Sequence, residues 1–517
     1  MKKFVVCGIA AFMLLGVAAA KKPNIIFLIT DDQNRETLSC YGGNALTPNI
    51  DKLAGEGIRF TRFTTSSPVC TPTRYTCLSG RYASRARGLQ KNWNEGESMS
   101  IEWNTTLEPD LVNVPKVMKA NGYRTGMVGK WHVGGLNEAE VNKLKPESIT
   151  KKSRLTDPGV QEFLELRQRM LCETMRKSHG FDYVSRFYPG NAQHRHLPEA
   201  LDVHNLEWVM EGAFEFLDET PEDQPFFLYL ATTISHAPYP VLGQDDNPYI
   251  CEGGLLKTLP KAGMPSRKSV FERVKEAGTD PDLVWATWLD DAVGSLRNKL
   301  EEMGELENTL IIYFSDQEVA AKGSLYYNGV GSPTFITQVG KTPHAVSDAN
   351  LQNVDFAPTI FDYCGITPPD DMLLDGRSFM PLLKGEELKN WKKVQYCEIG
   401  YFRSVITDQF RYISLRVPEN LPEKAERMGG ITWETKVTEV NGNPLKNVPM
   451  YEQWHRRHKE AWTENWWDQD QLFDSRNDPQ ESRNLADSPE YAAQLEKMKS
   501  LLSEELERFP FSYGEFK

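Results

Sequence analysis

Three apolar segments of the sequence, residues 24–30, 225–231 and 309–314, have the composition of strands that are buried on both faces. They are nearly continuous runs of β-branched, aromatic and leucine residues, which is typical of the central strands of a parallel sheet. Polar side chains that could carry chemistry follow each run: Asp31 and Asp32, Ser235 and His236, and Ser315 and Asp316. Open α/β sheets place their sites at the carboxyl ends of such strands. We therefore expect these side chains to meet at one edge of an α/β sheet.

An amphipathic helix is predicted directly before the third run. Apolar residues recur there at three- and four-residue spacing from Trp285 to Met303. The helix also contains Asp290 and Asp291. We interpret this acidic pair as structural, because acidic residues on such a helix are usually buried in local hydrogen bonds or solvated. The charged stretch of residues 138–176 is predicted to form a long loop and a surface helix.

The C-terminal part of the sequence predicts a second, smaller unit. A polar connection at residues 386–391 is followed by short strand patterns at residues 394–399 and 410–414, and a helical pattern covers residues 495–506. We expect a catalytic α/β domain over residues 21–388 and a smaller α+β domain over residues 389–517.

The first twenty residues have the pattern of a secretory signal peptide. Lys2 and Lys3 precede an apolar stretch at residues 4–17, and Ala18, Ala19 and Ala20 form a small-residue cleavage site. A membrane span needs about 20 apolar residues, and this run is shorter. We expect residues 1–20 to be removed, the mature protein to be periplasmic or secreted, and no stable membrane anchor.

The charge and the cysteines narrow the function further. The formal net charge is −13, so the global field repels nucleic acid, and an anionic substrate needs a local cluster of cations.

Removal of Cys7 with the signal peptide leaves seven of the eight cysteines. An odd number in an exported protein suggests that one thiol has another fate. The pairing of the other six stays open, and some of them could be buried thiols.

A dense motif surrounds Cys70. The segment reads Cys70-Thr71-Pro72-Thr73-Arg74 and is followed by Leu78-Ser79-Gly80-Arg81. Alone, this short string could be a structural cysteine at the start of a helix, with Pro72 in the first turn. Other characteristic segments occur in a fixed order along the chain: residues 24–32, 47–51, 57–60, 122–125, 129–132, 235–238, 308–310, 472–474 and 478–485. Together they resemble the type I, formylglycine-dependent sulfatases of the alkaline phosphatase superfamily.

The resemblance implies a fold and a set of roles. The fold is an alkaline-phosphatase-like α/β core with a large mixed sheet between helices, plus a smaller C-terminal α+β domain with a short antiparallel sheet. A formylglycine-generating maturation enzyme would oxidise Cys70, and the aldehyde hydrate would be the nucleophile. One calcium ion would be held by the family's ligand set: Asp31, Asp32, Asp316, Gln317 and the modified Cys70. Carboxylate and amide oxygens are the ligands that Ca²⁺ prefers.

The resemblance also assigns the basic residues. Arg74 would hold the oxygen of the nucleophile, and Lys130 and Lys322 would neutralise the sulfate. His132 is the candidate base and His236 the candidate acid, a role suited to an imidazole. Because Lys130 and His132 are two residues apart in a strand-like segment, we expect them to share one face of a strand.

Two departures from the family pattern concern the substrate. Where the family usually has an aspartate, then an asparagine or histidine, then a glycine, this chain has Asp316, Gln317 and Glu318. No arginine follows Lys322 in residues 328–333, where many relatives carry one. These two changes keep the chemistry credible but leave the substrate open. A third, mild departure is Thr73 in place of the commoner serine, which bears on recognition by the maturation enzyme.

We therefore interpret the protein as an exported sulfatase that hydrolyses sulfate esters, with a sulfated carbohydrate as the favoured substrate. The nearest alternatives are a phosphate or phosphonate monoester hydrolase of the same superfamily and an N-sulfoglycan sulfamidase. A non-catalytic glycan-binding relative is the alternative from another class. We expect the stretches at residues 179–196 and 239–264 to line the pocket. His194, Arg195 and His196 within them could contact a sugar or form an exposed polar surface.

Overall fold

The computed structural model describes residues 21–416, 465 and 468–517, except residues 92, 94, 97, 195 and 393. The predicted signal peptide and Arg195 lie outside the described residues. None of the helices in the described ranges combines the length and the apolar character needed to cross a bilayer.

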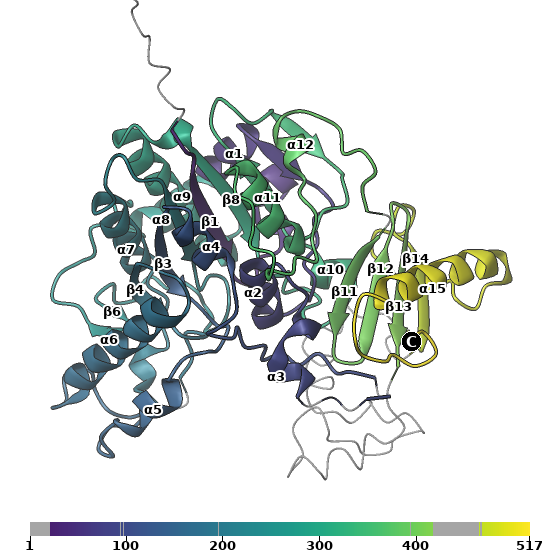
Figure 1. Cartoon of the computed structure of the whole chain (residues 1–517). Helices are drawn as coiled ribbons and strands as arrows, with labels where there is room; N and C mark the ends of the chain where they lie inside the picture. Colours follow the sequence, from purple (N-terminus) through teal and green to yellow (C-terminus); the bar gives the residue numbers. More distant parts are fainter. Residues whose placement is uncertain are drawn as a thin grey trace, which may run out of the picture.

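A mixed eight-stranded sheet forms the centre of the larger part of the molecule (Figure 1), with the strand order β10-β2-β9-β8-β1-β5-β3-β4. Its strands are β1 (Asn24–Thr30), β2 (Ile58–Phe60), β3 (Arg124–Lys130), β4 (Tyr183–Tyr188), β5 (Phe226–Ala231), β8 (Thr309–Ser315), β9 (Thr334–Thr337) and β10 (Ala345–Ser347). The strands from β8 to β4 run parallel, whereas β9 is antiparallel to β8 and β2. The apolar runs at residues 24–30, 225–231 and 309–314 form β1, β5 and β8. These strands are buried and lie side by side in the order β8-β1-β5, which confirms the prediction of buried central strands.

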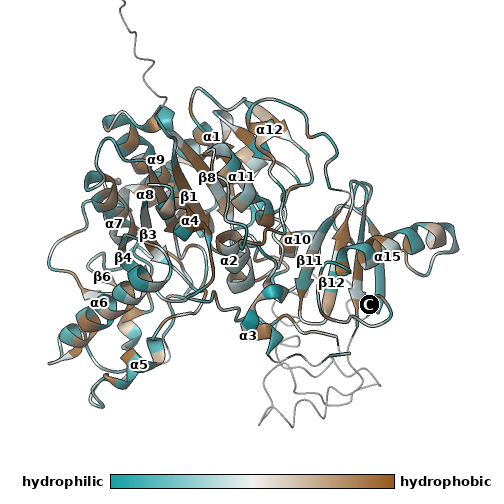
Figure 2. Cartoon of the chain, viewed as in Figure 1, coloured by the Kyte–Doolittle hydropathy of each residue, from teal (hydrophilic) through white to brown (hydrophobic). Residues whose placement is uncertain are grey.

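Alternating side chains of the central strand β1 point into two cores. Phe27 belongs to the core on one face of the sheet and Leu28 to the core on the other. The first core is covered by α2 (Cys70–Ser79), α4 (Val114–Ala120), α6 (Val160–Ser178), α11 (Phe356–Tyr363) and α12 (Met380–Leu383). The second is covered by α1 (Pro48–Gly55), α7 (Leu206–Asp218), α8 (Arg267–Ala277) and α9 (Val284–Glu302). Figure 2 shows the hydrophobic residues concentrated on the central strands between these helices.

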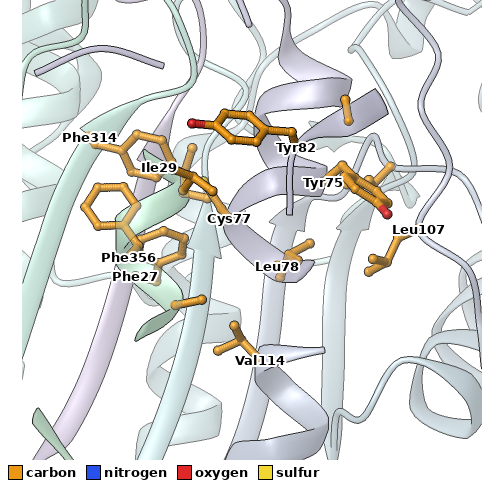
Figure 3. Close-up of a cluster of buried hydrophobic side chains, with 14 of the residues drawn as sticks. Phe27, Ile29, Tyr75, Cys77, Leu78, Tyr82, Leu107, Val114, Phe314 and Phe356 are labelled. Carbon is orange, nitrogen blue, oxygen red and sulfur yellow. The ribbon is translucent and has the colours of Figure 1, made fainter. Parts of the chain in front are cut away.

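Aromatic rings fix the central strands against the first helical layer. The ring of Phe27 lies 5.1 Å from that of Phe314 and 5.3 Å from that of Phe356, measured between centroids. Figure 3 shows these rings beside α2, whose residues Tyr75 and Leu78 are also buried. Because large apolar side chains pack on both sides of α2, the position of its first residue, Cys70, is determined by the core.

A four-stranded antiparallel sheet follows in the C-terminal part (Figure 1), in the order β11 (Gln395–Ile399), β12 (Phe402–Ile406), β13 (Phe410–Leu415) and β14 (Asp470–Asp474). The helix α15 (Ala492–Leu506) covers one face. The other face packs against Val69 and Leu325, which neighbour Cys70 and Lys322 closely in the sequence. The pattern of the sequence predicts β11, β13 and α15, and the family resemblance covers the segment that forms β14. The strand β12, a short strand that includes the polar residues Arg403 and Ser404, was not predicted.

The remaining helices and strands are short: α3 (Arg87–Gln90), α5 (Glu138–Lys143), α10 (Tyr327–Val330), β6 (Ile250–Cys251) and β7 (Gly254–Leu255). The acidic pair on α9 is structural, as predicted. Asp290 accepts hydrogen bonds from the Ile50 backbone at 2.7 Å and from Asn49 at 2.8 Å, and Asp291 forms an ion pair with Arg273.

Candidate active site

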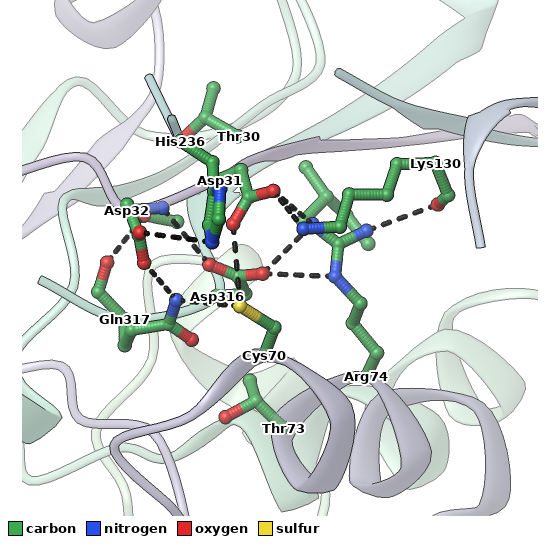
Figure 4. Close-up of polar contacts among 12 residues, drawn as sticks. Thr30, Asp31, Asp32, Cys70, Thr73, Arg74, Lys130, His236, Asp316 and Gln317 are labelled. Atoms are coloured by element: carbon green, nitrogen blue, oxygen red, sulfur yellow. Dashed lines mark hydrogen bonds and ion pairs between the residues drawn. The ribbon is translucent and has the colours of Figure 1, made fainter. Parts of the chain in front are cut away.

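Four potential metal ligands meet at the carboxyl edge of the central sheet. Thr30 of β1 pairs with Ser315 of β8, so Asp31 and Asp316 leave the two strands at the same level. One ligand atom from each of Asp31, Asp32, Asp316 and Cys70 lies within 4.8 Å of the other three, and all four residues are buried. The two strand ends predicted to carry the ligands therefore do bring them together (Figure 4).

Cys70 is the first residue of α2, and its side chain points into this cluster. Its Sγ lies 3.0 Å from Gln317 Nε2, 3.4 Å from Asp31 Oδ1 and 3.5 Å from Lys322 Nζ. The residue is 2% exposed. The amino end of a helix carries a partial positive charge, which favours negative charge at this position.

Arg74 lies one helical turn after Cys70 and is fully buried. Its Nε and Nη2 lie 2.9 and 2.8 Å from Asp316 Oδ2, and its Nη1 donates to the Lys130 carbonyl at 3.1 Å. The guanidinium therefore links α2, β8 and β3. Among its described contacts, Arg74 bonds to groups around Cys70 and not to Sγ itself.

Two buried lysines neutralise the carboxylates. Lys130 pairs with Asp31 and donates to Asn191 Oδ1 at 2.7 Å. Lys322 pairs with Asp32 at 2.7 Å. In β3 the residue before Lys130 has to be glycine: Gly129 has φ +92°, and a Cβ there would stand 1.9 Å from the Ala231 carbonyl oxygen of β5. This close approach of β3 and β5 positions Lys130.

The two histidines enter the site from loops. His236 Nε2 lies 3.7 Å from Asp32 Oδ2. The expectation that His132 shares a strand face with Lys130 is wrong. Strand β3 ends at Lys130, and His132 adopts a left-handed backbone conformation with φ +55°, so the alternation of a strand no longer applies. His132 still lines the cavity in front of Cys70.

The charges around Cys70 shift several pKa values. Burial alone would raise the pKa of Asp31, but Lys130 and His236 outweigh it and hold this pKa well below the usual range. Burial, aided by Asp31, raises the pKa of Asp316. Burial and the two carboxylates also raise the pKa of Cys70 far above that of a free thiol. The protein surroundings therefore keep an unmodified thiol protonated, which makes it a poor nucleophile.

The donor set fits a hard divalent cation. Three carboxylates at one buried point repel one another unless positive charge lies between them. The amide oxygen of Gln317 is also buried and has no hydrogen-bond partner among the residues that the structure describes, while its Nε2 donates to Asp32 and Cys70. Rotation of this amide by half a turn would direct the oxygen toward the carboxylates. Asp31, Asp32, Asp316 and Gln317 could thus offer oxygen ligands to Ca²⁺.

A cavity of about 1040 Å³ opens in front of Cys70. His132, His236 and Lys322 line it on the side of the reacting groups, and Trp103, Tyr239 and Trp285 supply aromatic walls. Of the two stretches predicted to line the pocket, residues 179–196 contribute Asn191 and Gln193, and residues 239–264 contribute Tyr239.

The sequence analysis did not single out Asn191, and it left the role of His194 open. Asn191 holds Lys130 and lines the cavity. It follows the end of β4, so the rule that singles out polar residues beyond strand ends could have found it. His194 is not part of an exposed surface: its side chain is 8% exposed and its Nε2 lies 2.7 Å from Glu252 Oε2. His196 is exposed.

All seven cysteines in the described part of the chain are free of disulfide bonds. Five of them, including Cys70, are buried, and Cys40 and Cys364 are partly exposed. None of the six cysteines whose pairing the sequence left open is therefore paired in the structure.

The sheet order, the carboxylate cluster and the C-terminal antiparallel sheet define an alkaline-phosphatase-like hydrolase. The family model described as Sulfatase matches residues 23–366, and the chain belongs to this family. The enzyme is accordingly a sulfuric ester hydrolase.

Known proteins of this family resemble the chain over most of its length. An N-acetylglucosamine-6-O-sulfatase of Bacteroides thetaiotaomicron is 26% identical over 439 residues, which cover 73% of this chain and 74% of the relative. Human arylsulfatase A is 28% identical over 398 residues, covering 72% and 69% of the two chains. A solved structure from a study of glycosaminoglycan metabolism by B. thetaiotaomicron has a TM-score of 0.60 at 19% identity, covering 94% of this chain and 99% of the other. This structure shows the shared fold.

Proposed function

We propose that this protein is an exported sulfatase that removes O-sulfate groups from a sulfated carbohydrate, using a formylglycine made from Cys70 and one calcium ion. The observation that carries the proposal is the position of Cys70 Sγ. It lies at the amino end of α2, between the carboxylates of Asp31 and Asp316 and beside Lys322. In the active enzyme the oxygen of the modified residue would take the place that Sγ marks.

Calcium and formylglycine, the two groups that the family implies, would supply a Lewis acid and a nucleophile that the unmodified side chains lack. Calcium would polarise the sulfate oxygens and favour an ionised nucleophile. The aldehyde hydrate offers two hydroxyls, one for attack on sulfur and one for release of sulfate, whereas a sulfated thiol has no such route.

The remaining steps fall to residues of this chain. Lys130 and Lys322, both buried beside the cluster, would bind the sulfate oxygens. Fixed cations next to a reacting group stabilise the charge that develops there. Arg74 would hold Asp316 in position beside the nucleophile.

The two histidines would move the protons. His236 faces the cavity from the loop after β5 and would give a proton to the leaving oxygen of the ester. His132 would take a proton from the second hydroxyl at position 70. Both lie on the wall of the cavity where the ester must enter.

A carbohydrate substrate is supported by the walls of the cavity and by the relatives. Trp103, Tyr239 and Trp285 offer flat apolar faces, on which the carbon-bound hydrogens of a sugar ring can pack. The N-acetylglucosamine-6-O-sulfatase relative is named for a sulfated amino sugar. The N-terminal signal pattern agrees with a substrate met outside the cytoplasm.

Mass analysis of the peptide containing Cys70 tests the mechanism. Protein made with a competent maturation system should carry the aldehyde, and full sulfatase activity with an unmodified thiol would refute the proposal.

Parallel assays on an aryl sulfate, an aryl phosphate and an N-sulfated glucosamine separate the sulfatase from the phosphohydrolase and the sulfamidase. Absence of turnover on every ester, with the aldehyde present, would favour the non-catalytic glycan-binding alternative.

A further inference from the structure

The cavity in front of Cys70 continues into two others. A second cavity of about 440 Å³ shares Thr71, Asn104, His132, Asn191 and Gln193 with it. A third cavity of about 530 Å³ shares Asn142 and His196 with the second. The three cavities therefore adjoin one another, from Cys70 past Arg167 of α6 to α5, and we call this row of cavities the groove. The first cavity alone is as large as typical small-ligand sites, so the groove exceeds what a single sugar requires.

The middle cavity is built around a buried ionic network. Arg167 Nη1 lies 2.6 Å from Glu252 Oε1, and His194 Nε2 lies 2.7 Å from the other oxygen of Glu252. Arg167 also pairs with Glu138 at 3.3 Å. Arg167 and Glu252 are at most 2% exposed, so the network is fixed by the fold. Because the two acidic groups offset the charges of the arginine and histidine, this part of the groove suits the hydroxyls of a sugar better than a further anion.

The outer cavity has the opposite character. Three lysines, Lys143, Lys145 and Lys151, stand against one glutamate, Glu147, among its described lining residues. Lys143 also forms an exposed ion pair with Glu140 at 2.6 Å, so the excess comes from Lys145 and Lys151. This local excess of positive charge contrasts with the net charge of −13 of the whole chain. A cationic wall at the far end of a groove that starts at a sulfate site is complementary to a second anionic group on the same ligand.

We propose that the groove binds an anionic oligosaccharide and not only a sulfated monosaccharide. The sulfated residue lies at Cys70, the hydroxyls of the following part of the chain meet the Arg167–Glu252–His194 network, and a second sulfate or a carboxylate reaches the lysines of the outer cavity. This assignment rests on the proposed function, because it takes the sulfate site to be at Cys70. It adds a specificity-determining region on α5 and the loop that follows it.

The first experiment compares kcat/KM for sulfated saccharides of increasing length with kcat/KM for a small aryl sulfate. The test variant is Lys143→Gln/Lys145→Gln/Lys151→Gln. The matched control, Lys341→Gln/Lys384→Gln/Lys389→Gln, removes the same charge from exposed positions outside the three cavities. The ratio of oligosaccharide to aryl sulfate kcat/KM should fall by up to about tenfold in the test variant, because the cations that face the second anionic group are lost. The loss should appear mainly in KM and shrink at high salt, and the control should keep the ratio.

A binding measurement separates this proposal from the proposed function. In the Cys70→Ala protein, the Kd for defined anionic oligosaccharides should tighten with chain length, and the three lysine substitutions should remove that gain. An unchanged ratio and unchanged Kd in the lysine variant, or an equal loss in the control, would overturn the groove assignment. Length-dependent binding without any sulfatase turnover of the aldehyde-bearing enzyme would overturn the proposed function and leave the groove supported.

Discussion

Glu318 Oε1 lies 2.5 Å from Arg35 Nε, and this ion pair joins the loop after β8 to the loop after β1. Glu318 also accepts from the Arg35 backbone amide at 3.2 Å. The guanidinium packs over the ring of Tyr327, 3.9 Å from its centroid. The acidic residue that replaces the family's glycine is therefore directed away from the carboxylate cluster. It fixes the two loops that carry Asp31, Asp32 and Asp316.

Replacement of Glu318 by glutamine should destabilise the protein. The substitution leaves the Arg35 charge in a largely buried place without its partner, which costs roughly 3 kcal/mol of unfolding free energy. Urea unfolding of the mature protein measures this loss. Glu307→Gln, at an exposed position, serves as the control and should change stability by less than about 0.5 kcal/mol. Equal stability of the two variants would show that the ion pair does not hold the loops.

Replacement of Asn191 by alanine should lower the sulfatase activity without unfolding the protein. The substitution removes an acceptor from the Lys130 ammonium, which then keeps only Asp31 as a partner among its described contacts. Loss of a hydrogen bond to a charged group predicts a fall in kcat/KM of about tenfold or more. Gln193→Ala, an exposed residue on the same cavity wall, is the control. A fall of the same size in both variants would mean that the wall matters and the Lys130 contact does not.

Substitution of Cys70 by alanine should abolish turnover, by at least about 10³-fold, because the nucleophile is lost. The melting temperature should stay close to that of the parent, since the side chain is small. Cys364→Ala, a partly exposed thiol away from the site, should retain full activity. Sulfate release by the Cys70→Ala enzyme at a rate near that of the parent would exclude Cys70 as the source of the nucleophile.

Removal of calcium should weaken both activity and stability. A ligand that binds only the folded protein stabilises it by about 2.7 kcal/mol at a concentration 100 times its Kd. Thermal unfolding with a chelator and with added Ca²⁺ measures this difference. In Asp316→Asn the gain from Ca²⁺ should be much smaller, because one carboxylate ligand is lost. A melting temperature that does not respond to Ca²⁺ in the parent would argue against the metal site.

Stability should decrease with falling pH because of His179. Burial lowers the pKa of this imidazole from 6.5 to about 4, and its ring packs edge-on against Trp131. The unfolded chain binds this proton at higher pH than the folded chain does. Stability from the neutral ring is thus fully present above pH 6.5 and is lost as the pH falls toward 4, by up to about 1.4 kcal/mol per pH unit.

The measurement is the unfolding free energy across this pH range in the parent and in His179→Gln. The variant should show a flatter dependence, whereas His196→Gln, which changes an exposed histidine, should follow the parent. Identical pH profiles for the parent and His179→Gln would show that other groups cause the acid sensitivity.

The strand patterns predict the carboxylate cluster because hydrophobicity and chain direction are local properties. The runs that become β1 and β8 each end at an aspartate, and parallel pairing of the two strands brings those aspartates together. The same reasoning places Lys130 but not His132. The chain leaves the strand at Lys130 and turns through a left-handed residue, which the spacing of the two side chains does not reveal.

The sequence by itself determined the buried strands, the order of the family segments, the cysteine at the start of a helix and the identity of the candidate ligands. Only the tertiary structure decided that Asn191 holds Lys130, which lies 61 residues away, and that Glu318 pairs with Arg35 across 283 residues. It also decided that His194 is buried against Glu252 and that the three cavities of the groove adjoin one another. The physical reason is that periodicity records which side chains avoid water, whereas contacts between distant residues depend on strand order, register and loop conformation.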